Sequence, residues 1–170
     1  AIDAGIGMFN VESEAEFENL SRLAAEAERQ VRCALRLNPD VYDPKTHTYT
    51  ATGKKESKFG VDIARAEAFF RRYGRDAHAR LDGIPLHIGS PIYSAEPYVQ
   101  AITKALELMG RLAAAGFVVR ALDIGGGFAA DYVADASPVA ADYAAAIVPL
   151  LAGRGLEVIL EPGRQIGANA

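Results

Sequence analysis

The stretch LDIGGGF, residues 122–128, runs from a short apolar segment straight into three glycines, and it decides the fold. Short apolar segments are typical of strands buried on both faces of a parallel sheet. The chain contains four more of them, each followed by a turn. We therefore predict five strands, at residues 7–11, 31–37, 84–88, 118–124 and 157–160.

Long amphipathic stretches separate these strands and predict helices at residues 13–29, 63–74, 95–116 and 140–153. Ser13 with Glu16 forms a capping-box pattern, and Gly74 and Gly116 are expected to close the second and third helices. Pro149 should lie near the end of the fourth. Strands that alternate with helices predict an α/β fold with a parallel sheet, in a single domain covering residues 1–170.

The composition excludes several classes of protein. The 170 residues carry a net charge of −4, which argues against nucleic-acid binding. No apolar run is long enough to cross a bilayer, and we expect no signal peptide because no basic region precedes an apolar one. Cys33 is the single cysteine, so the sequence predicts a cytoplasmic protein without a disulfide.

Unusual residues follow four of the predicted strands. The motifs are LRLNPD (35–40), LHIGS (86–90), LDIGGG (122–127) and LEPGR (160–164). All four lie at the carboxyl ends of strands, which is the edge where parallel α/β proteins bind ligands. The polar stretch 38–60 has no clear period, and a loop of this length is usually functional.

Part of this edge is suited to an anion. Successive glycines allow backbone N–H groups to approach a phosphate, although a triple glycine also occurs as a plain tight turn. Ser90 and Arg164 offer further donors to phosphate or carboxylate. The alternatives are a turn that begins at Ser90 and a surface ion pair at Arg164.

Two other residues there admit a structural and a functional interpretation. His87 is either a core histidine bonded to a carbonyl or an imidazole stacked on a planar ligand. Glu161 follows an apolar run, where a carboxylate needs a partner. That partner is either Arg164 or Arg36, in an ion pair, or a protonated heteroaromatic nitrogen. The histidine spacing does not indicate a zinc site.

Taken in order, five motifs resemble the fold-type III pyridoxal-phosphate decarboxylases of the alanine racemase-like barrel type. These are ALRLNPD, THTYTATGKKESKFG, LHIGSPI, LDIGGGF and EPGR; GIGMFNVES resembles a middle barrel strand of the family. Within the family, the set is most similar to the diaminopimelate decarboxylases. The resemblance implies a partial (β/α)8 TIM barrel, about strands four to eight, without the first strands and the carboxyl-terminal β-domain.

The resemblance also implies a role for each matching residue in binding pyridoxal 5'-phosphate. His87 would stack on the pyridine ring, Glu161 would pair with its nitrogen, and Arg36 would lie near its substituents. Arg164 would contact the cofactor or the substrate carboxylate. The phosphate would be held by Ser90, Gly125, Gly126, Gly127 and Gly163, with Pro162 inside the same motif.

The implied reaction is decarboxylation of meso-2,6-diaminopimelate to L-lysine, the last step of lysine biosynthesis, by a homodimer with a shared active site. None of the lysines lies on a strand like the one that carries the family's Schiff-base lysine. We therefore expect a fragment with no catalytic lysine of its own, inactive alone. Ornithine, arginine or carboxynorspermidine decarboxylases of the same fold remain alternatives, as does a non-catalytic homologue that binds cofactor or phosphate.

Overall fold

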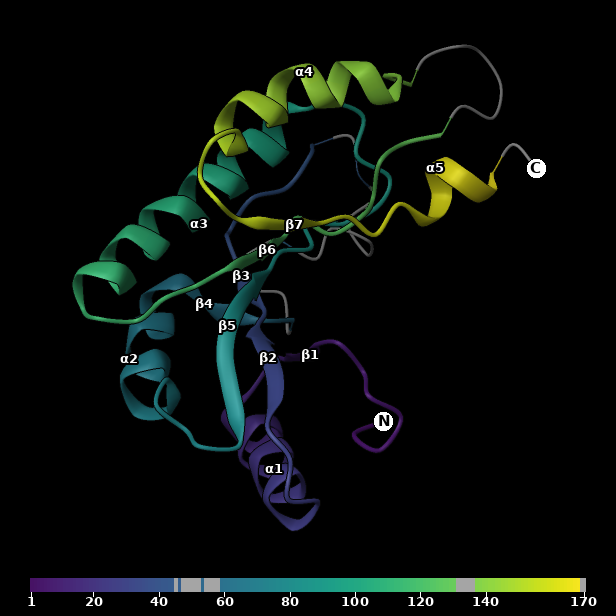
Figure 1. Cartoon of the computed structure of the whole chain (residues 1–170). Coiled ribbons are helices and arrows are strands. Elements are labelled where there is room, and N and C mark those ends of the chain that lie inside the picture. Colours follow the sequence, from purple (N-terminus) through teal and green to yellow (C-terminus); the bar gives the residue numbers. More distant parts are fainter. Residues whose placement is uncertain (45, 47–52, 54–58, 131–136, 169–170) are drawn as a thin grey trace.

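The fold is built on a parallel sheet of five strands in the order β1, β2, β5, β6, β7 (Figure 1). The computed structural model describes residues 1–44, 46, 53, 59–130 and 137–168. The strands are β1 (Phe9–Val11), β2 (Val31–Leu35), β5 (Ala79–Pro85), β6 (Ala121–Asp123) and β7 (Glu157–Ile159). The five predicted strands are thus confirmed. The third begins earlier than predicted, because the charged Arg80 and Asp82 conceal its start in the sequence.

Two short strands were not predicted. They are β3 (Leu37–Asn38) and β4 (Val61–Asp62), which pair in parallel as a second, two-stranded sheet. The predicted second strand therefore ends at Leu35 and its last part belongs to β3. The segment between β3 and β4 is the long polar stretch, and residues 45, 47–52 and 54–58 of it lie outside the described part of the chain.

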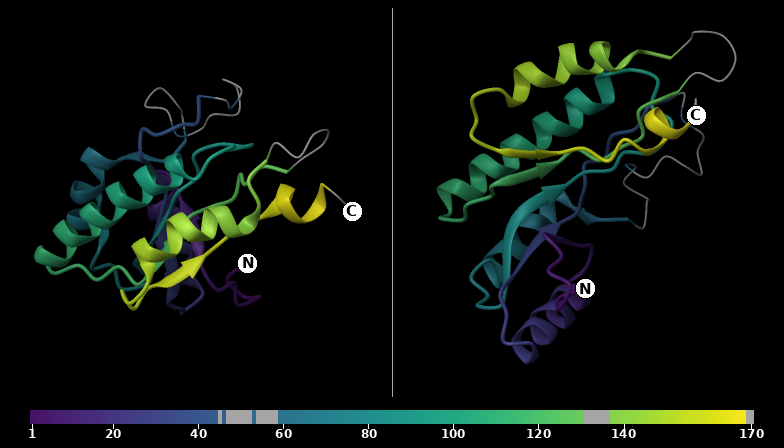
Figure 2. Two further views of the ribbon diagram at one scale, coloured as in Figure 1. Left: turned by 90° about the horizontal axis from the view of Figure 1, so that it is seen from above. Right: turned by 45° about the vertical axis from the view of Figure 1, so that its right-hand side comes forward.

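Four long helices lie on one side of the main sheet (Figures 1 and 2). They are α1 (Glu14–Glu26), α2 (Ile63–Tyr73), α3 (Glu96–Ala114) and α4 (Ala140–Leu151), and a fifth, short helix, α5 (Gly163–Gly167), follows β7. Pro149 lies in the last turn of α4, as predicted. One cluster of buried apolar residues fills the space between sheet and helices, with Phe17, Phe70 and Leu122 among its members.

The helix ends follow the sequence signals, with two differences. The Ser13 hydroxyl caps α1 by accepting from the N–H of Glu16, at 3.2 Å. The Glu16 carboxylate, however, accepts from the N–H of Glu12 at 2.6 Å, one residue before the expected partner. Gly74 caps α2 in a right-handed conformation, so the turn does not require glycine there. Space requires it instead, because a Cβ would lie 2.5 Å from the Phe70 carbonyl oxygen.

The main sheet is open. β1 and β7 stand at its two ends, and within the described chain neither has a second strand partner. An open parallel sheet with helices on one side is the arrangement of a partial barrel. Among the described residues, no helix is both long and apolar enough to cross a membrane.

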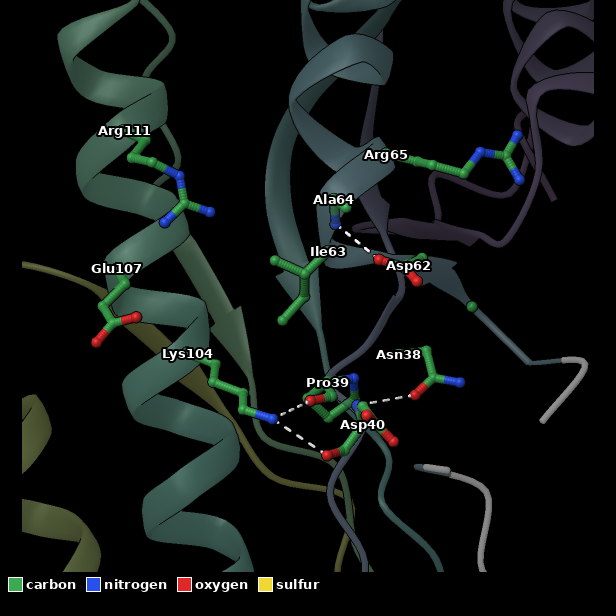
Figure 3. Close-up of a pocket in the computed structure, with 11 residues that line it drawn as sticks. Asn38, Pro39, Asp40, Asp62, Ile63, Ala64, Arg65, Lys104, Glu107 and Arg111 are labelled. Atoms are coloured by element: carbon green, nitrogen blue, oxygen red, sulfur yellow. Dashed lines mark hydrogen bonds between the residues drawn. The ribbon is translucent and has the colours of Figure 1, made fainter. Parts of the chain in front are cut away.

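The turn Asn38 to Asp40 packs toward the helices rather than toward the other strand ends. Lys104 reaches from α3 and donates to the carbonyl oxygens of Pro39 and Asp40, at 2.8 and 3.1 Å (Figure 3). A groove of about 590 Å³ lies around this contact, between α2 and α3. The polar residues of LRLNPD after Leu37 therefore secure a turn.

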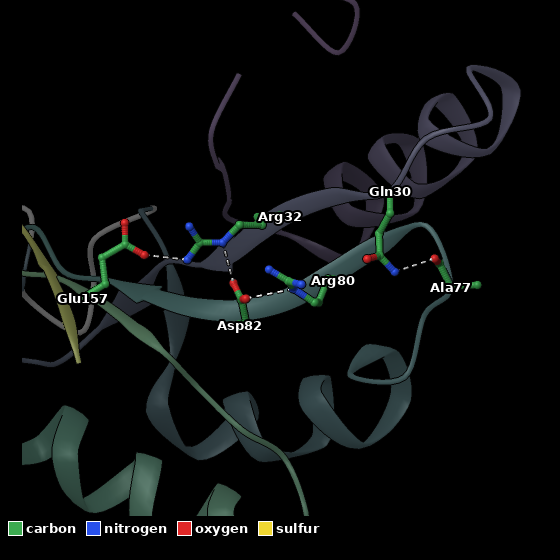
Figure 4. Close-up of polar contacts among 6 residues, drawn as sticks. All are labelled: Gln30, Arg32, Ala77, Arg80, Asp82 and Glu157. Atoms are coloured by element: carbon green, nitrogen blue, oxygen red, sulfur yellow. Dashed lines mark hydrogen bonds and ion pairs between the residues drawn. The ribbon is translucent and has the colours of Figure 1, made fainter. Parts of the chain in front are cut away.

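The amino end of the sheet is held by charged side chains. Asp82, 1% exposed, accepts from Arg32 at 3.4 Å and from Arg80 at 2.9 Å (Figure 4). Arg32 also donates to Glu157 on β7, at 2.7 Å. This cluster of four residues, the amino-end network, links β2, β5 and β7 by charge.

Candidate functional site

Three of the four predicted strand ends meet at the carboxyl edge of the main sheet. Leu86 donates from its N–H to the carbonyl oxygen of Asp123 at 2.8 Å, and Glu161 donates to that of Gly125 at 2.9 Å. The segments LHIGS, LDIGGG and LEPGR therefore continue side by side beyond the last residues of β5, β6 and β7. The sequence prediction of a common edge is confirmed for these three motifs.

The glycine turn after β6 is packed tightly between the two neighbouring segments. A Cβ on Gly126 would lie 2.1 Å from the carbonyl oxygen of Glu161, and one on Gly127 would lie 2.0 Å from that of Gly89. Any larger residue would push the three segments apart. The glycines are needed here for close approach, which a plain tight turn does not explain.

This turn also presents unused hydrogen-bond donors. No acceptor for the N–H of Gly126 or Gly127 is found in the part of the chain that the structure describes. Tyr98 on α3 holds the turn in place, because its buried hydroxyl donates to the Gly126 carbonyl oxygen at 2.8 Å. Donors without a partner on a rigid turn are suited to an anion.

His87 lies next to the glycine turn and is half-buried. A Cβ placed on Gly125 would be 3.1 Å from its Nδ1. Burial lowers the pKa of His87, the nearby Arg36 charge lowers it further, and Glu161 acts in the opposite direction. Burial and the Arg36 charge therefore favour the neutral imidazole.

The Glu161 side chain is exposed, and its charge adds to the effect of burial in raising the pKa of the Asp123 carboxyl group to about 6. In the described chain, Glu161 forms no ion pair with either Arg36 or Arg164. The structural interpretation of this acid, an ion pair with one of those arginines, is therefore wrong. Asp123 itself was missed by the sequence analysis, although it is also an acid inside an apolar run.

Arg36 lies between an acid and an aromatic ring. Its guanidinium donates to the Glu12 carboxylate at 2.6 Å and sits 5.2 Å from the centre of the Phe59 ring. The same carboxylate accepts from the N–H of Gly60 at 3.0 Å. Glu12, also missed from sequence, thus joins Arg36 to the end of the long polar stretch.

Comparison with known proteins agrees with this arrangement of motifs. The family profile "Pyridoxal-dependent decarboxylase, pyridoxal binding domain" matches residues 1–168. The chain belongs to this family. It is 45% identical over its whole length to a diaminopimelate decarboxylase from Pseudomonas aeruginosa, and 43% identical to one from Aquifex aeolicus. It covers 41% and 40% of these two proteins, so it spans about two fifths of their length.

Solved structures show the same fold. The crystal structure of diaminopimelate decarboxylase from Helicobacter pylori complexed with L-lysine matches 97% of the chain with a TM-score of 0.90 at 34% identity, and the chain covers 42% of it. The lysine/ornithine decarboxylase of Vibrio vulnificus complexed with putrescine matches 96% with a TM-score of 0.74, and the chain covers 40% of it. At 24% identity that second likeness concerns the fold alone.

The EPGR segment, residues 161–164, is the last of the motifs that meet at the carboxyl edge of the sheet. Pro162 is the N-cap residue just before α5, and the N–H of Gly163 donates to the carbonyl oxygen of Glu161 at 2.9 Å. The Arg164 Nε donates to the Ser90 hydroxyl at 3.4 Å. Ser90 and Arg164, which are far apart in sequence, are thus brought together.

Of the five lysines in the sequence, only Lys104 lies within the described residues. Lys104 lies on α3 and donates to two backbone carbonyl oxygens, away from the glycine turn. The other four, Lys45, Lys54, Lys55 and Lys58, lie outside the described residues. Within the described chain, no lysine side chain therefore reaches the site.

Proposed function

We propose that this chain is the cofactor-binding part of a pyridoxal-phosphate-dependent diaminopimelate decarboxylase. One observation carries the proposal: the described segments that match the family's cofactor motifs, LHIGS, LDIGGG and LEPGR, converge on one edge of the sheet. The whole-length identity of 45% to a diaminopimelate decarboxylase supports the choice within the family.

The residues at the edge fit the cofactor. A glycine turn that a Cβ would fill, with two N–H groups lacking acceptors in the described chain, suits its phosphate. Ser90 and Arg164 add a hydroxyl and a guanidinium on the same side. We assign the phosphate to Gly125, Gly126, Gly127 and Ser90, with Gly163 and Arg164 at the rim.

The ring would lie between His87 and Glu161. When bound, pyridoxal phosphate takes up the electron pair left at the α-carbon by loss of CO2, most readily with a protonated ring nitrogen. The Glu161 carboxylate favours that proton by its charge. The neutral His87 would cover the ring face without adding a competing positive charge. Arg36, which is paired with Glu12, would lie near the ring substituents.

The substrate assignment rests on the relatives. The Pseudomonas and Aquifex proteins are both diaminopimelate decarboxylases, and the Helicobacter enzyme was crystallised with L-lysine. We propose meso-2,6-diaminopimelate as substrate and L-lysine as product of the whole protein. Arg164 is the residue in this chain that we assign to a substrate carboxylate, in addition to the phosphate rim.

The test is an assay of the whole protein that carries this chain. With pyridoxal phosphate added, we expect CO2 and lysine from meso-2,6-diaminopimelate, and rates with ornithine or arginine lower by at least about 100-fold. Faster turnover of ornithine or arginine would contradict the substrate assignment. Cofactor binding without turnover of any of the three would favour the non-catalytic alternative.

We further propose a homodimer in the cytoplasm. The resemblance to the family supports the dimer, and the single, buried Cys33 is compatible with a reducing compartment. Light scattering of the whole protein checks the assembly, with a mass of twice the subunit expected and a single-subunit mass as the contradicting result.

A further inference from the structure

Tyr98, near the start of α3, is a buried tyrosine to which the proposed function gives no role. It is 1% exposed. Its hydroxyl donates to the carbonyl oxygen of Gly126 at 2.8 Å, and a Cβ placed on Gly127 would lie 3.4 Å from the same hydroxyl oxygen. Burial raises the pKa of Tyr98, so the phenol keeps its proton and remains a hydrogen-bond donor. The hydroxyl group therefore contacts the glycine turn directly from the core.

This hydrogen bond fixes the direction of a neighbouring N–H group. The carbonyl group of Gly126 and the N–H group of Gly127 belong to one planar, trans peptide unit, so they point in opposite directions. Because the carbonyl oxygen of Gly126 faces the Tyr98 hydroxyl, the N–H of Gly127 faces away from Tyr98 and the core. This N–H is one of the two donors of the turn for which no acceptor is found in the described chain.

The preceding peptide unit of the turn is oriented by the main chain instead. The carbonyl oxygen of Gly125 accepts from the N–H of Glu161 at 2.9 Å, which directs the N–H of Gly126 to the opposite side. For the carbonyl oxygen of Gly126, by contrast, the described residues supply no backbone donor. A peptide unit between two glycines rotates easily, because neither residue has a Cβ to oppose the rotation. Without the Tyr98 hydroxyl, this unit would be free to turn its carbonyl oxygen outward, where it would repel an anion.

We propose that Tyr98 is a positioning residue, whose hydroxyl holds the Gly126 carbonyl group so that the N–H of Gly127 points at the cofactor phosphate. The inference rests on the proposed function, which places the phosphate at the glycine turn. The Tyr98 ring is itself held by packing. It stacks on Phe128 with 4.8 Å between ring centres and 10° between planes, and Tyr143 meets it edge-on at 5.8 Å and 83°. A hydroxyl on a ring with this packing has a fixed position and transmits it to the turn.

Tyr143 on α4 provides a comparison within the same aromatic cluster. A buried tyrosine hydroxyl needs a partner in any case, so the hydrogen bond of Tyr98 alone does not separate positioning from plain stability. The Tyr143 hydroxyl is also buried, donates to the carbonyl oxygen of Ile92 at 2.6 Å and accepts from the N–H of Ala129 at 3.4 Å. Neither group belongs to the peptide units that carry the unused N–H groups. Loss of this hydroxyl should therefore lower stability and spare the phosphate donors.

The experiment compares Tyr98→Phe with Tyr143→Phe in the whole protein that carries this chain. Each variant removes one buried hydroxyl and keeps the aromatic ring. The readout is the affinity of the cofactor-free protein for pyridoxal phosphate and for pyridoxal, which lacks the phosphate. The ratio of the two affinities isolates the contribution of the phosphate site, which a general loss of stability does not change.

In Tyr98→Phe we expect pyridoxal phosphate to bind about tenfold to 100-fold more weakly, the value of one hydrogen bond to a charged group, and pyridoxal to bind within about threefold of the parent. Tyr143→Phe should keep the affinity ratio of the parent within about threefold. An unchanged ratio in Tyr98→Phe would overturn the inference. Equal falls of the ratio in both variants would also overturn it, since the packing of the cluster would then be the cause.

A measurement on the parent protein guards against a Tyr98→Phe variant that fails to fold. Hydrogen exchange at single-residue resolution reports the protection of the Gly127 N–H. At matched occupancy of the site, pyridoxal phosphate should slow this exchange and pyridoxal should not. Equal exchange with both compounds, in a parent that prefers pyridoxal phosphate, would overturn the inference, because other donors would then hold the phosphate. A parent that binds the two compounds equally well would instead contradict the proposed function, which places the phosphate at this turn.

Discussion

Asp82 and Asp123 are the same residue type on neighbouring strands, 1% and 3% exposed, and they serve different ends. Asp82, at the amino end, lies between two arginines in the amino-end network. Asp123, at the carboxyl end, accepts from the backbone N–H of Gly125, and no cation of the described chain forms an ion pair with it. Burial is therefore not what separates the two positions. The presence or absence of a paired cation does, because it decides whether the carboxylate charge is balanced within the fold or left for a ligand.

The largest expected effect comes from removing the charge of the carboxyl end. Glu161→Gln in the whole protein should lower kcat about 100-fold or more, because the ring nitrogen loses the carboxylate that keeps it protonated. Its thermal midpoint should change little, since the side chain is exposed. The matched control at the amino end is Glu157→Gln, for which steady-state kinetics should show kcat within about twofold of the parent, as expected for an exposed ion pair. Equal losses in both variants would contradict the division of roles.

Substitutions at the amino end of the sheet should lower the stability of the fold and leave kcat unchanged. The double variant Arg32→Met, Arg80→Met leaves Asp82 buried without a cation, which we expect to cost about 2 kcal/mol. The cost is reduced because the Arg80 side chain is 46% exposed and water can approach. Urea denaturation at neutral pH measures it, and kcat of the folded protein should be retained. Arg72→Met removes exposed ion pairs to Glu14 and Glu18 and a contact of the guanidinium with the Tyr73 ring, and it is the control, with a loss of less than about 1 kcal/mol expected.

Most helices and strands of the fold could be predicted from the sequence, whereas the site could be predicted only in part. Short apolar runs and helical periodicity located all five strands and four long helices. The two-residue strands β3 and β4 and the short α5 were missed, because pairs this brief leave no periodic signal. Gly74 was expected to end a helix through its conformation, and its actual reason is the space beside Phe70.

The missed site residues share a physical reason. Glu161 was recognised because an acid directly followed an apolar strand. Asp123 is also an acid in an apolar run, but the LDIGGGF motif was interpreted only through its three glycines. Glu12 lies more than a hundred residues from Glu161, and only strand pairing brings it to the same edge. Contacts of this kind depend on the register of β1 with β2, which the sequence pattern alone does not specify.

The pH dependence of stability should separate the two aspartates further. The folded pKa of Asp123 is raised to about 6 from the ordinary 3.8, so its contribution is fully present below 3.8 and is lost as the pH rises through about 6. The free energy of unfolding of the parent, compared with Asp123→Asn, should therefore decline between these values. Denaturation curves of both proteins across this range measure the difference. A difference that grew with rising pH would contradict the raised pKa.

The smallest expected effect tests how Arg36 is held at the carboxyl end. In Glu12→Gln the amide can still bond the Arg36 guanidinium, but the ion pair is lost. That pair is only half-buried, so we expect about a threefold weaker affinity for pyridoxal phosphate. Glu14→Gln, two residues along, breaks an exposed pair with Arg72 outside the site and is the matched control. Cofactor titration distinguishes them: an unchanged affinity in Glu12→Gln would mean that the Phe59 ring alone is enough to hold Arg36, and a loss shared with Glu14→Gln would point to the packing of α1 instead.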